Sequence, residues 1–353
     1  MRIMVDIGHP ADVHFYKYFM WEMRRRGHEF TVTARDKDVT LNLLKAYAIE
    51  HSVVGKMGNG IFDLVKEWVK RDQEIYSIAR RFRPDILTGF HNPCVAHISK
   101  LIGAKSIIFT DTEHEKLANM ITFPFADVIF IPTCFRNNLG RHQIRYNGYK
   151  ELAYLHPNYF RPDPSVLGEL GLTERDRFVI VRFVAWQATH DIGQHGLDLQ
   201  AKRRLVEELG KYARILITSE SSLPEEFEKY RITVPPERMH DLLYYATLYI
   251  GEGATIASEC AVLGTPAIYV NTLRLGYLDE QEKRYGLVYN FSDPETAQTE
   301  ALEKALELLR RENLEEEWQA KRERLLSDKI DVTEFMVKFI ENYPESFNEY
   351  KSR

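Results

Sequence analysis

A glycine-rich stretch in the second half of the chain contains residues suited to binding an anion. It reads Gly251-Glu252-Gly253-Ala254-Thr255-Ile256-Ala257-Ser258-Glu259, with apolar, β-prone runs on either side. The pattern predicts a strand, a tight turn and a helix, where glycines let a ligand approach the backbone and the helix end attracts negative charge. We expect Thr255 to cap the helix and Glu259 to accept hydrogen bonds from the hydroxyls of a ribose. The stretch therefore predicts a nucleotide-diphosphate site, with an ordinary structural turn as the alternative.

The stretch departs from two common nucleotide-binding motifs. Ile256 stands where a dinucleotide loop has its third glycine or alanine, and Asn271 ends the next strand where that loop has its partner acid. The chain also contains no GxxxxGK[ST] sequence. A diphosphate site without a hydride cofactor is therefore the better interpretation.

Two histidines near the start of the chain could act as a general base. His14 lies early in a helix expected at 13–26, and a helix N-terminus disfavours an imidazolium ion, so the ring could accept a proton near neutral pH. His9 lies in the preceding loop and could take the same role. For both, local capping or packing is the alternative.

Two further polar segments follow expected strands. Asp111-Thr112-Glu113-His114-Glu115 could grip or deprotonate sugar hydroxyls, or could cap a helix; its spacing matches no standard metal motif. The loop at 189–196 contains His190 and His195, which are five apart, unlike a helical zinc pair. Together with Arg182 on the strand before it, this loop could bind a phosphate or could be an ordinary surface loop.

The elements that position these residues alternate between strand and helix. Strands are expected at 1–7, 29–34, 51–54, 85–89, 106–109 and 127–132, and again at 177–183, 213–218, 246–250 and 267–270. Such alternation predicts an α/β protein of βαβ units, whose parallel sheets bind ligands at the carboxyl ends of their strands. This rule marks as candidates His9, His14, His91, Asn92, Asp111 and Glu113. We expect two Rossmann-like, doubly wound domains at 1–155 and 165–328, joined by a proline-rich connection.

Composition excludes several classes of protein. The 353 residues carry a net charge of −5, which argues against nonspecific nucleic-acid binding. The three cysteines, Cys94, Cys134 and Cys260, predict neither a disulfide framework nor a cysteine zinc site, and the cytoplasm is the expected compartment. We expect no signal peptide and no membrane span, so membrane contact would be peripheral at most.

These residues together suggest a family. Two α/β halves, with Gly-x-Gly-Ala-Thr…Ser-Glu…Leu-Gly-Thr-Pro at 251–266 in the second, resemble the GT-B glycosyltransferase superfamily. The donor loop looks like that of MurG-type N-acetylglucosaminyltransferases and of non-hydrolysing UDP-N-acetylglucosamine 2-epimerases. With the opening at 6–15 and the segment at 149–155, nearly the whole chain resembles the DUF354 family, which carries no established reaction.

The resemblance implies roles for individual residues. His14 falls where several GT-B transferases keep a catalytic base, Glu259 matches the acid that binds ribose, and Gln281 resembles the residue that reaches the donor sugar. The two domains would face each other across a cleft, and a final helix within 329–353 would cross back to the first domain. The expected donor-binding residues are Gly251, Gly253, Ala254, Thr255, Ser258, Glu259, Gln281 and Arg182.

The chain also departs from both enzyme groups. Residues 10–13 replace the glycine-rich loop of MurG-like enzymes, so the acceptor site must differ. Glu113 matches the acid of the epimerases' His-Val-Glu segment, but Asp111 replaces its histidine. The strand around Arg182 lacks the epimerases' His-Arg-Arg segment, and the turn around Gly89 lacks their Gly-Asp pair. An epimerase is therefore the less favoured reading.

We therefore expect a metal-independent GT-B-type glycosyltransferase that uses a nucleotide-diphosphate sugar, UDP-linked by preference, in surface polysaccharide or glycoconjugate synthesis. Its partners would be that donor and an unidentified acceptor, with no other cofactor and no nucleic acid; a homodimer is left open. The expected catalytic residues are His14, His9 and Glu113. A UDP-sugar 2-epimerase or hydrolase, and a non-catalytic nucleotide-sugar binding protein, are the alternatives.

Overall fold

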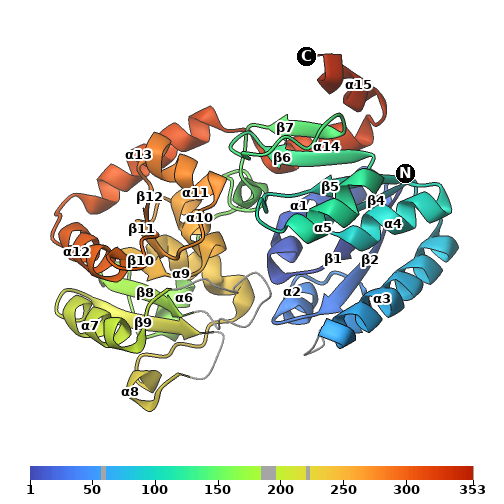
Figure 1. Cartoon of the computed structure of the whole chain (residues 1–353). Helices are drawn as coiled ribbons and strands as arrows, with labels where there is room; N and C mark the ends of the chain where they lie inside the picture. Colours follow the sequence, from blue (N-terminus) through green and yellow to red (C-terminus); the bar gives the residue numbers. More distant parts are fainter. Residues whose placement is uncertain (57–60, 184–195, 220–222, 353) are drawn as a thin grey trace. The chain divides into compact units, whose positions relative to one another are not determined.

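The computed structural model describes residues 1–56, 61–183, 196–219 and 223–352 (Figure 1). The chain divides into two compact units, Met1–Tyr154 with Ile330–Arg353, and Leu155–Lys329. Each unit contains one sheet in which the described strands pair in parallel, and helices connect successive strands except β6 and β7. The predicted α/β class with two parallel sheets is confirmed.

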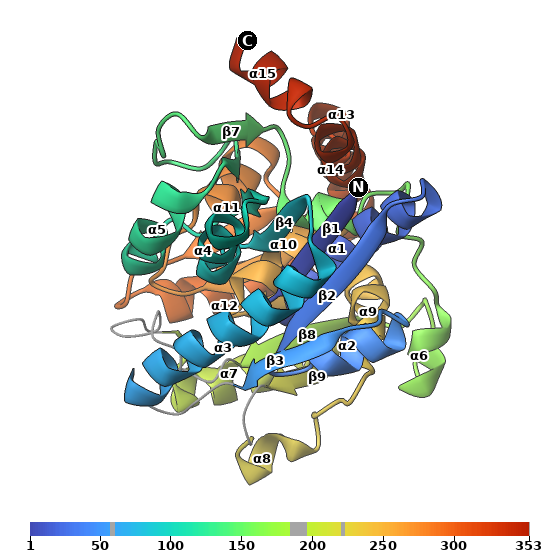
Figure 2. The same ribbon diagram turned by 90° about the vertical axis from the view of Figure 1, so that its right-hand side faces the viewer.

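The first unit contains a seven-stranded sheet in the order β3-β2-β1-β4-β5-β6-β7. Right-handed crossovers place α1 and α2 on one face and, because the chain reverses direction after β3, α3, α4 and α5 on the other. Figure 2 shows α3 and α4 in front of this sheet. The elements are β1 (Arg2–Ile7), α1 (Pro10–Arg25), β2 (Glu29–Asp36), α2 (Thr40–Ala46), β3 (Ser52–Lys56), α3 (Ile61–Phe82), β4 (Ile86–Phe90), α4 (Pro93–Ile102), β5 (Lys105–Phe109), α5 (Lys116–Thr122), η1 (Phe123–Phe125), β6 (Val128–Pro132), β7 (Gln143–Tyr146), η2 (Lys150–Ala153), α14 (Val332–Glu341) and α15 (Glu345–Ser352).

The second unit contains a five-stranded sheet in the order β12-β11-β10-β8-β9. Helix α10 packs against α9, α11 and α13, whereas α12 packs against α7. The elements are α6 (Ser165–Glu169), β8 (Phe178–Phe183), α7 (Leu199–Leu209), β9 (Arg214–Ser219), α8 (Glu225–Glu228), η4 (Pro236–Arg238), α9 (Met239–Tyr245), β10 (Leu248–Gly251), α10 (Ala254–Leu263), β11 (Ala267–Val270), α11 (Gly276–Glu280), η5 (Gln281–Tyr285), β12 (Val288–Phe291), α12 (Ala297–Leu309) and α13 (Leu314–Asp328).

Each sheet has a point where the strand order reverses. In the first unit this point lies between β1 and β4, and in the second between β8 and β10. Ligands of open α/β sheets bind beyond the carboxyl ends of the strands at such a point. His9 follows β1 by two residues, and the glycine turn directly ends β10. Both predicted sites therefore lie where this type of sheet binds ligands.

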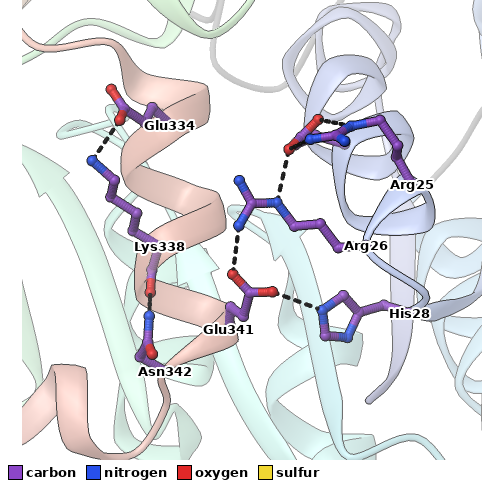
Figure 3. A network of polar contacts seen from close by, with 8 residues as sticks. Arg25, Arg26, His28, Glu334, Lys338, Glu341 and Asn342 are labelled. Carbon is purple, nitrogen blue, oxygen red and sulfur yellow. Dashed lines mark hydrogen bonds and ion pairs between the residues drawn. The ribbon is translucent and has the colours of Figure 1, made fainter.

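Helix α14 is part of the first unit through apolar and charged contacts. Phe335 and Phe339 lie with ring centroids 5.0 and 4.6 Å from that of Phe130 on β6. The last residue of the helix, Glu341, accepts hydrogen bonds from Arg26 Nη1 at 2.8 Å and His28 Nε2 at 3.2 Å (Figure 3). The hydrogen bond from His28 lowers the pKa of Glu341 below its usual value, and Arg26 contributes a smaller effect in the same direction. These contacts attach α14 to β6 and to the segment that follows α1.

The structure differs from the sequence-based expectation at several elements. Helix α1 begins at Pro10 rather than at residue 13, because His9 already caps it and Pro10 fits the first helical position. Strands β7 and β12, of four residues each, were not predicted. Both runs mix apolar and polar residues, whereas β11, which is equally short, is a continuous apolar run that the sequence does reveal.

Candidate functional site

The turn between β10 and α10 is the centre of the candidate donor site. Gly251 has no room for a side chain, because a Cβ atom there would lie 2.7 Å from Tyr249 Oη and 2.8 Å from the Arg182 carbonyl oxygen. Gly253, in extended conformation, is the N-cap of α10, and no described side chain caps this helix end. The glycine spacing therefore belongs to a close-packed turn that leads into a helix with exposed N–H groups.

The prediction that Thr255 caps this helix is wrong. Helix α10 begins at Ala254, so Thr255 is its second residue. The cap is Gly253, whose carbonyl oxygen accepts from the Ala257 N–H at 3.2 Å. A glycine has no side chain to bond to the first N–H groups, which leaves those of Ala254 and Thr255 to a ligand or solvent. The correction strengthens the case for an anion at this position.

Arg182 lies beside the glycine turn on the neighbouring strand β8, in register with Gly251. A Cβ atom on Gly253 would lie 3.7 Å from both Cδ and Nε of Arg182, so the arginine side chain runs along the turn. Tyr249 donates from its hydroxyl to the Gly253 carbonyl at 3.3 Å, and burial raises the pKa of this tyrosine well above its ordinary value. A permanent cation and a helix N-terminus thus flank one turn, the combination that suits a diphosphate.

Farther along α10, Ser258 is in contact with Gln281. Gln281 Nε2 donates to Ser258 Oγ at 2.8 Å, and both residues are fully buried. Gln281 Oε1 is buried without a hydrogen-bond partner among the described residues. A buried amide oxygen in that state costs free energy unless a ligand or water supplies a donor. The structure therefore brings Gln281 into contact with α10, the helix that also carries Glu259 of the predicted donor set.

Glu259 is held by a residue that sequence reasoning missed. His240 Nε2 lies 2.9 Å from Glu259 Oε1, and the two side chains are only 5% and 7% exposed. His240 belongs to α9, which packs against α10. The pair is 19 residues apart in sequence, and no local pattern reveals it. The predicted ribose-binding carboxylate therefore has a fixed internal partner.

Glu252, inside the glycine turn, has a structural role. It is 2% exposed, and its Oε1 accepts a hydrogen bond from the Leu197 N–H at 2.7 Å. Its carbonyl oxygen accepts from Asn271 Nδ2 at 3.3 Å. The acidic side chain is thus bonded to the protein backbone, and it ties the turn to the segment that precedes α7.

In the first unit, His9 is occupied as a helix cap. Its Nδ1 accepts a hydrogen bond from the Ala11 N–H at 3.2 Å, while the Asp12 carboxylate accepts from the His9 N–H, which completes a capping box. A neutral imidazole has one acceptor nitrogen, and here that nitrogen is already bonded. Protonation of His9 during a reaction would therefore break the cap of α1.

His14 is better placed to exchange a proton. It is 6% exposed, with its Nδ1 3.3 Å from the hydroxyl of Tyr47 and its ring centroid 5.4 Å from that of Tyr154. Because α1 begins four residues earlier, His14 lies beyond the first turn, where the helix dipole has faded. If Nδ1 donates to Tyr47, the neutral ring carries its lone pair on Nε2, which is the tautomer that a general base acting through Nε2 requires.

Glu113 is engaged with Arg136 rather than with either histidine. Its Oε1 accepts from the Arg136 backbone N–H at 2.5 Å, and its Oε2 lies 3.8 Å from Arg136 Nε. Its side chain is 10% exposed. This carboxylate holds the turn that follows β6, so its use as a catalytic acid would disrupt that turn.

Asp12 is a titratable residue that sequence reasoning passed over. It is 4% exposed, and its Oδ2 accepts from the backbone N–H groups of Gly8 and His9 at 3.1 and 3.0 Å. Burial raises the pKa of Asp12 to about 7, against the opposing effects of Lys150 and these two hydrogen bonds. Lys150, itself buried, lies 3.7 Å from Asp111. A carboxyl group that titrates near neutral pH thus lies two residues before His14.

The raised pKa of Asp12 predicts a pH dependence of stability. The folded state keeps the proton up to about pH 7 and the unfolded chain only to about pH 4, so stability falls as pH rises through this window, by at most about 4 kcal/mol. Urea unfolding of wild type and Asp12→Asn at pH 5 and pH 8 measures it. The variant, with no titrating group, should lose less stability between the two pH values. An equal loss in both proteins would show that Asp12 is ionised throughout.

Three further expectations from the sequence concern a histidine-containing loop, a metal site and a membrane span. His190 and His195 are outside the described ranges, so their contact with a phosphate stays a prediction. Over the residues that are described, no three side chains of His, Cys, Asp or Glu gather as metal ligands would. Within the same ranges, no helix combines the length and apolar character that crossing a membrane requires.

Comparison with known proteins gives one family match. The model of a family described as "Protein of unknown function (DUF354)" matches residues 1–343. An uncharacterized protein of Methanocaldococcus jannaschii is 23% identical over 281 residues, which cover 76% of this chain and 81% of that protein. Neither description states an activity.

Solved structures with the same fold include enzymes that act on sugars. The spinosyn rhamnosyltransferase SpnG, complexed with spinosyn aglycone, has a TM-score of 0.62 at 14% identity, covering 97% of this chain and all of that one. The UDP-GlcNAc 2-epimerase from Methanocaldococcus jannaschii has a TM-score of 0.61 at 12% identity, covering 93% and 99%. At such identities the likeness establishes the fold, that of GT-B glycosyltransferases and 2-epimerases, and not the reaction.

Proposed function

The chain belongs to the DUF354 family, and from this premise we propose that it transfers a sugar from a nucleotide-diphosphate donor, preferably a UDP-sugar, to a hydroxyl acceptor. The observation that carries the proposal is the glycine turn at the switch point of the second sheet, where an uncapped helix end and Arg182 flank one position. The proposed setting is surface polysaccharide or glycoconjugate synthesis in the cytoplasm.

In this proposal the second unit binds the donor. The diphosphate lies against the N–H groups of Ala254 and Thr255 and the Arg182 guanidinium, which stabilise negative charge as it develops on the leaving group. Glu259 accepts hydrogen bonds from the ribose hydroxyls. Gln281, with its buried unpaired carbonyl, receives a donor from the sugar or from a bound water.

The acceptor hydroxyl would lose its proton to His14 of the first unit. Nδ1 of His14 is placed to donate to Tyr47, which would leave Nε2 as the proton acceptor. His9 and Glu113 are the weaker choices, because the acceptor nitrogen of His9 caps α1 and the carboxylate of Glu113 is bonded to Arg136.

A nucleotide binding screen tests the donor half of the proposal. Thermal shift followed by calorimetry with UDP, UDP-N-acetylglucosamine, dTDP and GDP should show stabilisation by at least one of them. Glu259→Gln should weaken that ligand about tenfold, because the amide accepts fewer and weaker hydrogen bonds from the ribose. Glu303→Ala, an exposed carboxylate on α12, is the matched control and should bind as wild type does. No stabilisation by any nucleotide diphosphate would refute the donor site.

An assay without acceptor separates the proposed transfer from its alternatives. Because a UDP-GlcNAc 2-epimerase has the same fold, the alternative reactions are epimerisation and hydrolysis of a UDP-sugar. Inversion at C2, or rapid UDP release from a UDP-sugar alone, would favour that reaction. Donor binding with no turnover against any polysaccharide or glycolipid extract would favour a non-catalytic binding protein. Sugar transfer that requires such an acceptor supports the proposal.

A further inference from the structure

A buried hydrogen bond joins α9 to α10, between His240 and the carboxylate of Glu259, the proposed ribose-binding residue. His240 projects from the second residue of α9 and Glu259 from the second turn of α10, and their Nε2 and Oε1 atoms are 2.9 Å apart. With both side chains more than nine-tenths buried, the carboxylate cannot rely on solvent for hydrogen bonds. A histidine that donates from Nε2 supplies one of the bonds that make a buried carboxylate tolerable.

The histidine is itself held in place by its surroundings. The ring of Phe160 meets the His240 imidazole edge-on, with centroids 6.4 Å apart and planes at 84°. The next residue, Asp241, accepts from the Asp163 backbone N–H at 3.0 Å and from Arg238 Nε at 3.0 Å. These bonds fix the first turn of α9 against the segment that precedes α6 in the same unit. His240 therefore acts from a rigid position.

A fixed donor determines which way the carboxylate of Glu259 faces. A glutamate has several side-chain torsions, and in a helix its carboxylate would otherwise sample more than one orientation. The hydrogen bond to Oε1 restricts that choice, and because a carboxylate can accept about four hydrogen bonds in all, this bond alone does not exhaust its capacity. Ordering the acceptor before the ligand arrives lowers the entropic cost of binding.

From this geometry we infer that His240 is a positioning residue for ribose: through its bond to Glu259 it makes the site select ribonucleotides over 2′-deoxyribonucleotides. The inference rests on the proposed donor site and adds to it the residue that sets its sugar specificity. His240 does not contact the ligand. Its effect is confined to the vicinal hydroxyls, since the diphosphate interacts with a different part of α10, the helix end beside Arg182.

The test compares the binding of three ligands to the full chain by calorimetry: UDP, 2′-deoxy-UDP and inorganic pyrophosphate. If the screen selects another base, the ribonucleoside diphosphate of that base and its 2′-deoxy form replace the two uridine nucleotides. Wild type should prefer UDP over 2′-deoxy-UDP by about tenfold, the value of one hydrogen bond to a charged acceptor. His240→Asn should reduce this preference to about twofold or less. His240→Gln, whose amide nitrogen reaches the position of Nε2, should retain most of it. Pyrophosphate affinity should stay the same in all three proteins.

Two controls keep the comparison interpretable. Asn and Gln have the same polar group and differ by one methylene, so a general loss of packing would affect both, whereas a positional effect distinguishes them. Tyr244→Phe, which removes a hydroxyl from the same helix, should leave the preference unchanged. Unchanged pyrophosphate affinity shows that the end of α10 is intact in each variant.

The possible outcomes separate this inference from the proposed function. A preference that persists in His240→Asn overturns the inference and leaves the donor site standing. Equal binding of UDP and 2′-deoxy-UDP by wild type overturns the ribose role of Glu259 and, with it, that of His240. Failure of wild type to bind pyrophosphate and every nucleotide diphosphate of the screen overturns the proposed function itself.

Discussion

Replacing Gly251 with alanine should destabilise the second unit by about 3 kcal/mol and remove most of its nucleotide affinity. The added Cβ would lie 2.7 Å from Tyr249 Oη, 2.8 Å from the Arg182 carbonyl oxygen and 3.0 Å from Arg182 Cβ. The carbonyl oxygen belongs to a buried strand, and Tyr249 is 0% exposed, so neither can move aside at low cost. The turn would shift instead, and the end of α10 and Arg182 would move apart.

Gly168→Ala is the matched control for this variant. Gly168 lies in α6 of the same unit, and a Cβ there would meet nothing within 4 Å. Alanine also favours helix over glycine by up to about 1 kcal/mol, so this variant should be as stable as wild type or slightly more. Urea unfolding and UDP calorimetry on the two variants measure both effects. Normal stability and normal affinity in Gly251→Ala would mean that the turn is not close-packed and that its glycine has no role in binding.

The glycine turn and the helix that follows it could be predicted from the sequence because their signal is local. Gly251 and Gly253 are two residues apart, at the end of an apolar run and ahead of a helix, and this spacing already predicts a close turn and a helix N-terminus. The identity of the cap was misjudged because threonine is the commoner capping residue. Only the backbone angles of Gly253 show that the cap lies two residues earlier, so that the helix begins at Ala254.

The partners of the predicted residues were not readable, because they come from distant parts of the chain. His240 meets Glu259 only when α9 packs on α10, and Lys150 acts on Asp12 only when η2 packs against α1. A histidine near the start of a short helix has no mark in the sequence that distinguishes it from a surface residue. By contrast, Pro10 followed by Asp12 is a signal for a helix start at His9, since proline suits the first helical position and an acid suits the third.

His14→Ala should lower turnover by about 10²- to 10⁴-fold, the usual contribution of a general base, without weakening UDP binding. UDP affinity should be unchanged because the donor residues belong to the second unit and His14 to the first. Turnover is measured as UDP released from the donor that passes the binding screen, with a polysaccharide or glycolipid extract as acceptor. His51→Ala, another first-unit histidine, whose Nδ1 contacts the Ile49 carbonyl, should keep full turnover.

Tyr47→Phe distinguishes a base from a buried packing residue at position 14. The Tyr47 hydroxyl is 3.3 Å from Nδ1, and as an acceptor it holds the tautomer in which Nε2 is unprotonated. Its loss should lower turnover less than loss of the ring does, and should shift the pH profile, because the imidazole then titrates without that partner. A packing role predicts the opposite pattern: lower stability, an unchanged pH profile, and near-normal turnover in His14→Gln. Full turnover in His14→Ala with intact donor binding would move the base to another group, and Asp12, with a pKa of about 7, is then the next to test.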